Sequence, residues 1–183
     1  DHLLFVLALL FLVSDWKRLI VTVTAFTVAH SMTLAAATLG FVYVPQAPVE
    51  ATIALSVVFV AGEILHVAQG KPSFTARAPW IVAFVFGLLH GFGFAGALRQ
   101  IGLPQADIPL ALLFFNVGVE AGQVMFILAV VALLSLVSRF LPRRAPTGYG
   151  PWQAEQLIRV PVAYLVGSVA AFWVVQRVVG FWA

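Results

Sequence analysis

The chain alternates between long apolar runs and short stretches rich in charged residues, proline or glycine. Six apolar segments are apparent, covering residues of about 1–16, 18–41, 49–69, 79–99, 107–139 and 157–182. Most are close to the ~20 residues that an α-helix needs to cross the hydrocarbon core of a bilayer. The pattern predicts an all-α integral membrane protein, with about six transmembrane helices in a single domain over residues 1–183. A seventh helix is possible in a longer chain, and the first helix, beginning at Asp1-His2, is expected to continue upstream.

Composition supports a membrane protein. Hydrophobic residues make up 62% of the chain and charged residues 9%, with a mean hydropathy of +1.05, whereas soluble domains carry about 25% charged residues. The absence of cysteine excludes disulfides and thiolate metal ligands. No basic patch is interleaved with aromatic residues, so the expected partner is the lipid bilayer and not nucleic acid; a homo-oligomer remains open.

The positive charges predict the orientation. Eight of the ten Lys and Arg residues lie in or beside the first, third and fifth connections, and the second and fourth hold only Arg99. Cytoplasmic loops of membrane proteins carry an excess of Lys and Arg. The odd-numbered connections are therefore expected to face the cytoplasm, and both ends of the chain to face outward.

Two pairs of neighbouring segments resemble each other. FTVAHSMTLAAATLG aligns with FGLLHGFGFAGALRQ, so that His30 matches His90, and the segment after each carries one glutamate, Glu63 or Glu120. This suggests a parallel repeat of the second and third segments in the fourth and fifth, about an axis along the membrane normal. The glycines after His90 favour close helix packing, or a loosened helix whose carbonyls face an ion path.

Three histidines are expected at similar depth in the membrane. His2, His30 and His90 each lie 12 to 15 residues from a Lys or Arg at the basic boundary of their segment. At 1.5 Å per residue they are about 18–22 Å from that boundary. Buried imidazoles and carboxylates in a membrane pair with one another, bind ions or line wet cavities. The acids that could join the histidines are Asp1, Glu63 and Glu120.

Histidine and carboxylate donors without cysteine suit Ni²⁺, Co²⁺ or Zn²⁺. The hypothesis is a mid-membrane site for a divalent transition metal, with Asp1, His2, His30 and His90 as inner ligands. Glu120 and Glu63 would serve as further ligands or as proton-coupled acids. Three alternatives stay open: an intramembrane zinc enzyme, a b-type haem protein, and a structural subunit whose histidines only link helices. His66 is expected at the interface or beside Glu63, outside the core set.

Several motifs in order resemble those of the HupE/UreJ family of bacterial membrane proteins. They are DHLLF, FTVAHSMTLAAATLG, VEATIALSVVFVAGEIL, FGLLHGFGFAGAL and FNVGVEAGQ, which together cover about residues 1–126. The resemblance implies a multi-pass inner-membrane protein with a hydrogenase or urease accessory role and nickel or cobalt transport. It places the family's acid–histidine pair on Asp1-His2, its other histidines on His30 and His90, and its glutamates on Glu63 and Glu120. A transporter or metal-binding protein is thus favoured over an enzyme.

Overall fold

The computed structural model describes residues 1–101, 107–140 and 151–182, and in these ranges the chain is a bundle of helices without strands. The elements are α1 (His2–Leu12), α2 (Trp16–Thr38), α3 (Gln46–Ala68), α4 (Phe74–Arg77), α5 (Pro79–Ile101), α6 (Ile108–Phe140) and α7 (Pro151–Val179). Five of them, α2, α3, α5, α6 and α7, are long and apolar enough to cross a membrane. The predicted all-α membrane bundle is thereby confirmed.

The helix boundaries differ from the expected ones at both ends of the chain. The first helix is only 11 residues long and ends at Leu12, because Asp15 caps α2 by accepting a hydrogen bond from the backbone N–H of Arg18 at 2.9 Å. The last helix begins at Pro151 and not at about residue 157, so Pro161 lies inside it. The short helix α4 was not anticipated, since its four residues carry no apolar period.

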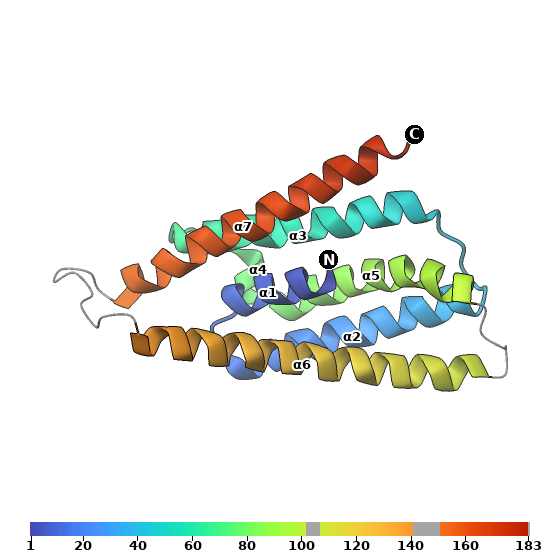
Figure 1. Ribbon diagram of the computed structural model, residues 1–183, viewed down its shortest axis with the longest axis horizontal. Helices are drawn as coiled ribbons and strands as arrows, with labels where there is room; N and C mark the ends of the chain where they lie inside the picture. Colours follow the sequence, from blue (N-terminus) through green and yellow to red (C-terminus); the bar gives the residue numbers. More distant parts are fainter. Residues whose placement is uncertain (102–106, 141–150, 183) are drawn as a thin grey trace.

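The long helices lie roughly parallel to one another and form neighbouring pairs (Figure 1). Helix α2 packs along α5, α3 packs along α7, and α6 flanks α2. The short α1 lies in the middle of the bundle and contacts α3, α6 and α7. Its first residues are thus placed part-way along the bundle, deep among the long helices.

The two ends of the bundle differ in charge. Helix α1 ends, α2 begins and α4 lies at one end, which we call the basic end because it carries Lys17, Arg18, Lys71 and Arg77. At the opposite end α2 ends, α3 begins and α7 ends (Figure 1). The side chains of Arg99, Arg139, Arg143 and Arg144, which entered the expected orientation, lie outside the described residues.

Glycines on α5 allow its close approach to α2. A Cβ added at Gly87 would lie 2.5 Å from the carbonyl oxygen of Phe26, and one at Gly91 would collide with the carbonyl oxygen of His30 and the hydroxyl of Thr33. Spaced four residues apart, the two glycines form one seam of the small-xxx-small type. Helix α5 stays continuous from Pro79 to Ile101, so the packing role expected of these glycines is confirmed. The seam brings the histidines of the two helices together.

Candidate metal centre

Histidines from three helices meet in the middle of the bundle. The ring of His2 on α1 lies with its centroid 5.2 Å from that of His30 on α2 and 5.3 Å from that of His90 on α5. His30 and His90 are 1% and 3% exposed. The structure therefore brings together the three histidines that residue counting placed at similar depth. We call them the histidine cluster.

The partners of His90 determine which of its nitrogens carries the proton. Its Nε2 lies 3.1 Å from the hydroxyl oxygen of Ser56 on α3. That hydroxyl already donates its single proton to the carbonyl oxygen of Ile53 at 2.6 Å. Ser56 must therefore accept, and His90 donates from Nε2–H. A neutral His90 then keeps its lone pair on Nδ1.

The same reasoning applies to His30. Its Nδ1 lies 3.2 Å from the side-chain oxygen of Asn116 on α6, and the amide nitrogen of Asn116 donates to the carbonyl oxygen of Leu112 at 2.8 Å. This second bond orients the amide, so that its oxygen accepts from Nδ1–H of His30. A neutral His30 therefore keeps its lone pair on Nε2. Histidines that bind metals are commonly held by such a hydrogen bond from the other ring nitrogen.

Three buried polar atoms beside the cluster lack a hydrogen-bond partner in the described chain: Nε2 of His2, Oδ1 of Asp1 and Nε2 of Gln123. The other carboxylate oxygen of Asp1 lies 2.6 Å from Nη2 of Arg177 on α7. The guanidinium also donates from Nη1 to the carbonyl oxygen of Glu50 at 2.8 Å, and its Nε lies 3.8 Å from the carboxylate of Glu50. Since a buried polar atom without a partner is costly, the unpartnered atoms of His2 and Asp1 mark a place where a further ligand would be stabilised.

Cavities reach the cluster from the end opposite the basic end and from the side of α6. The first has a volume of about 280 Å³, and polar or charged residues form much of its wall: Asp1, His2, Glu50, His90 and Arg177. The second measures about 410 Å³ and lies beside His2, His30 and several apolar or small residues of α6. His2 lines both cavities.

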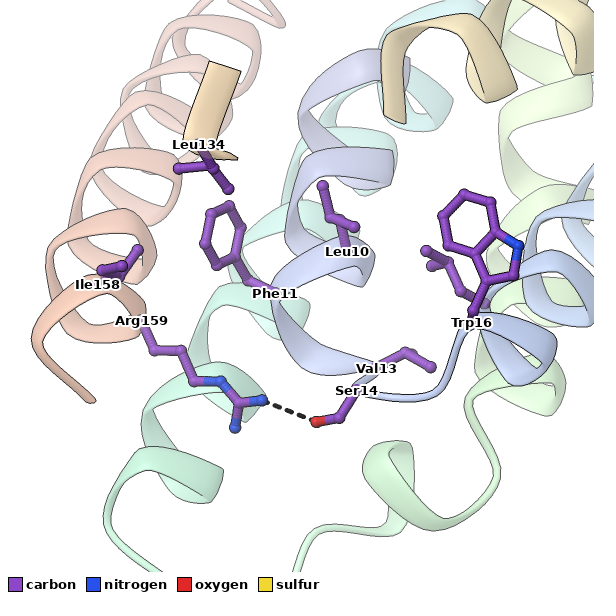
Figure 2. Close-up of a pocket in the computed structure, with 9 residues that line it drawn as sticks. Leu10, Phe11, Val13, Ser14, Trp16, Leu134, Ile158 and Arg159 are labelled. Atoms are coloured by element: carbon purple, nitrogen blue, oxygen red, sulfur yellow. Dashed lines mark hydrogen bonds between the residues drawn. The ribbon is translucent and has the colours of Figure 1, made fainter. Parts of the chain in front are cut away.

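Apolar side chains fill the space between the cluster and the basic end. Phe5 and Leu9 of α1 are fully buried, and they belong to one core with Val23 of α2 and Ile127 of α6. A further cavity of about 320 Å³ lies beyond this core. Figure 2 shows Phe11 and Leu134 in its wall, and Arg159 donating from Nη2 to the hydroxyl of Ser14 at 2.8 Å. Neither a histidine nor an acid lines that cavity, so it is separate from the cluster.

The two glutamates of the hypothesis lie away from the histidines. Glu63 is near the basic end, where its Oε2 accepts from the hydroxyl of Ser73 at 2.5 Å and its Oε1 lies 3.3 Å from Nδ1 of His66. His66 is therefore a partner of Glu63, one of its two expected positions. Glu120 accepts from the hydroxyl of Thr24 at 2.7 Å. Thr24 precedes His30 by six residues, which is about 9 Å along the helix.

The donor atoms of the cluster do not yet converge. Among the residues that the structure describes, no group of three or more His, Asp or Glu side chains is arranged to hold a metal ion. The ring planes of His2 and His30 meet at 86°, and those of His2 and His90 at 80°. Asp1 is engaged by Arg177. Metal coordination at this place therefore requires side-chain rotation, and a metal bound to Asp1 would compete with Arg177 for that carboxylate.

Comparison with known proteins shows the family. The profile described as HupE / UreJ protein matches residues 1–177. The chain belongs to the HupE/UreJ family. No curated protein and no solved structure matches it significantly.

Three polar residues around the cluster of this HupE/UreJ protein escaped the sequence analysis. Arg177 is a lone charge in an apolar run, which is a signal for function in a membrane segment. Gln123 is 2% exposed and accepts from the hydroxyl of Thr27 at 3.1 Å, and Thr24 binds Glu120. The two threonines lie in a helix whose sequence looks merely apolar. The approach of α6 gives each of them a side-chain partner, and Thr27 also lies 3.2 Å from the carbonyl oxygen of Val23 in its own helix.

Proposed function

We propose that this HupE/UreJ protein binds a divalent transition-metal ion at the histidine cluster and carries it across the membrane. Nickel is the first choice, with cobalt or zinc next. The observation that supports this most is the meeting of three histidines, two of them almost fully buried, at a place where Nε2 of His2 and Oδ1 of Asp1 have no partner in the described chain. A bound metal ion would give both atoms a partner.

The hydrogen bonds of His30 and His90 support a particular choice of ligand atoms. The inner ligands would be Nε2 of His30, Nδ1 of His90, the imidazole of His2 and the carboxylate of Asp1. Asn116 and Ser56 would act as positioning residues, since each binds the opposite ring nitrogen. Three imidazoles and one carboxylate form a donor set that suits Ni²⁺, Co²⁺ and Zn²⁺. Glu63 and Glu120 fall outside this inner set and remain candidates for proton coupling.

Arg177 gives the site a resident counter-cation. Its guanidinium neutralises Asp1 as long as no metal is bound. A divalent ion that arrives through the cavity would compete with Arg177 for the Asp1 carboxylate. Arg177 also binds the backbone carbonyl oxygen of Glu50 and lies near its carboxylate, so it would keep these contacts after releasing Asp1. The carboxylate of Asp1 is thereby neutralised and held in place while no metal is bound.

The path is asymmetric. A cavity lies between the cluster and the end near Glu50 and Arg177, while Phe5, Leu9 and their neighbours fill the space toward the basic end. If the basic end faces the cytoplasm, the cluster is accessible from outside and closed to the inside. We therefore infer uptake through the bacterial plasma membrane, with both ends of the chain outward. Release would require the apolar core around α1 to open.

Binding is tested by isothermal titration of the purified chain with Ni²⁺, Co²⁺ and Zn²⁺. His30→Ala and His90→Ala should each weaken binding by at least about tenfold. His66→Ala is the matched control, because His66 is largely exposed and binds Glu63 outside the cluster; it should bind as the wild type does. Absence of binding, or equal affinity in all three variants, rules the proposal out.

Transport is tested separately, by uptake of radioactive ⁶³Ni²⁺ into cells that produce the protein. Uptake that depends on His30 and His90 supports a permease. Binding without uptake would limit the function to holding the metal, and would refute the transport part of the proposal.

A further inference from the structure

A second site lies at the basic end, away from the histidine cluster. A groove of about 340 Å³ runs between the first turns of α2 and the junction of α4 with α5. One half of its wall is cationic and the other apolar; its residues are Lys17, Arg18, Val21, Arg77, Pro79 and Trp80. We call it the basic groove.

The basic groove concentrates positive charge with little to balance it. Within the described residues, no carboxylate lies within ion-pair distance of Lys17, Arg18 or Arg77. Asp15 is a neighbour, but it accepts the backbone N–H of Arg18 as the cap of α2. The first turns of α2 and α5 contain no acidic residue. Because helix N-termini are themselves positive, an anion bound in the groove would be stabilised by these cations and by the helix ends together.

The surroundings of the groove indicate which class of molecule would supply the anion. Trp80 is 51% exposed and Val21 56% exposed, at the boundary between the cationic residues and the apolar surface of the bundle. Val28 lies two turns further along the same face of α2 and is 50% exposed. Tryptophan of membrane proteins is enriched at the headgroup level. A ligand here would meet cations at one end and a lipid-exposed apolar strip at the other.

We propose that the basic groove binds an anionic phospholipid, with the phosphate between Lys17, Arg18 and Arg77 and the acyl chains along Val21 and Val28. Basic pockets between transmembrane helices are known places for acidic headgroups. Since the groove joins the α4–α5 junction to the start of α2, the bound lipid links the ends of two helices that carry histidines of the cluster. This role does not depend on metal transport.

The experiment is native mass spectrometry of the full chain, purified in detergent and exposed to equal amounts of phosphatidylglycerol and phosphatidylcholine. The wild type should retain phosphatidylglycerol preferentially. Arg77→Gln should lower that retention about fivefold, the effect of one cation near an anionic headgroup. Arg77→Lys keeps the charge and should retain the lipid. Arg77 is exposed, so neither substitution disturbs the core.

Lys71→Gln is the matched control, because Lys71 is an exposed cation at the same end but outside the groove. It should retain as much phosphatidylglycerol as the wild type. Equal retention of both lipids by the wild type, or equal losses in Arg77→Gln and Lys71→Gln, would overturn the proposal. Inorganic phosphate at millimolar concentration is the remaining arm: if it displaces the lipid completely, the groove binds a soluble anion and the assignment to a lipid is wrong.

Discussion

The glycine seam between α2 and α5 makes a prediction about both stability and metal binding. In Gly87→Ala the new methyl group would lie 2.5 Å from the carbonyl oxygen of Phe26 and 3.0 Å from Cβ of Ala29. Carbon–oxygen contacts between helices are favourable at about 3.3 Å and above. The two helices must therefore separate by about 0.8 Å at this level, because the obstacle is backbone and cannot rotate away.

A substitution at a second glycine separates the cost of the clash from the gain in helix propensity. An alanine in a helix interior is stabilised relative to glycine by up to about 1 kcal/mol, whereas overpacking costs about 1–3 kcal/mol. In Gly62→Ala on α3 the added Cβ meets no atom within 4 Å, so this variant has the propensity gain without the clash. The difference in the free energy of unfolding between the two variants should be about 1–3 kcal/mol, with Gly87→Ala the less stable.

The difference in stability is measured by unfolding in detergent micelles, followed by circular dichroism. The effect on metal binding is measured by nickel titration. Metal ligands must be held within about 0.5 Å of their working geometry. A separation of about 0.8 Å one turn from His90 and His30 should therefore weaken nickel binding about tenfold or more. If Gly87→Ala is as stable as Gly62→Ala and binds nickel equally well, the close approach of α2 and α5 is not what assembles the cluster.

Three further substitutions test individual contacts. Arg177→Gln frees the carboxylate of Asp1 from its 2.6 Å ion pair. Nickel affinity should rise several-fold in titration, while the free energy of unfolding should fall by about 1–2 kcal/mol. Unchanged nickel affinity would argue against competition between the metal and Arg177 for Asp1. Asn116→Ala removes the acceptor of Nδ1 of His30 and should cost about 10–100-fold in nickel affinity; an effect below twofold contradicts its positioning role. Glu63→Gln should leave nickel affinity unchanged, since Glu63 binds Ser73 at the basic end, and a tenfold loss would place it at the metal.

Much of the architecture could be read from the sequence because it depends on local properties. The length of an apolar run is tied to bilayer thickness, and five of the six predicted segments correspond to helices long enough to span a membrane. The depth of a histidine depends only on its distance from a charged boundary and on helical rise. The alignment of the two pairs of segments matched Glu63 with Glu120, but it could not show that Ser73 and Thr24 bind them.

The identity of the helix neighbours, by contrast, came from tertiary structure. Asp1 and Arg177 are separated by 176 positions, yet form the shortest ion pair described. Nothing near Arg177 in the sequence indicates that α7 ends beside the start of α1. The protonated nitrogens of His30 and His90 are likewise decided by Asn116 and Ser56, which lie on other helices.

The sequence by itself determined that this is an all-α membrane protein of the HupE/UreJ family with three histidines at one depth. Those properties can be read from hydrophobic periodicity, composition and motifs, all of which are local features of the sequence. Only the tertiary structure decided that the histidines touch, that Arg177 neutralises Asp1 and that both glutamates lie elsewhere. The physical reason is that side-chain partners depend on which faces of distant helices pack together, and at the seam this depends on the missing Cβ atoms of Gly87 and Gly91.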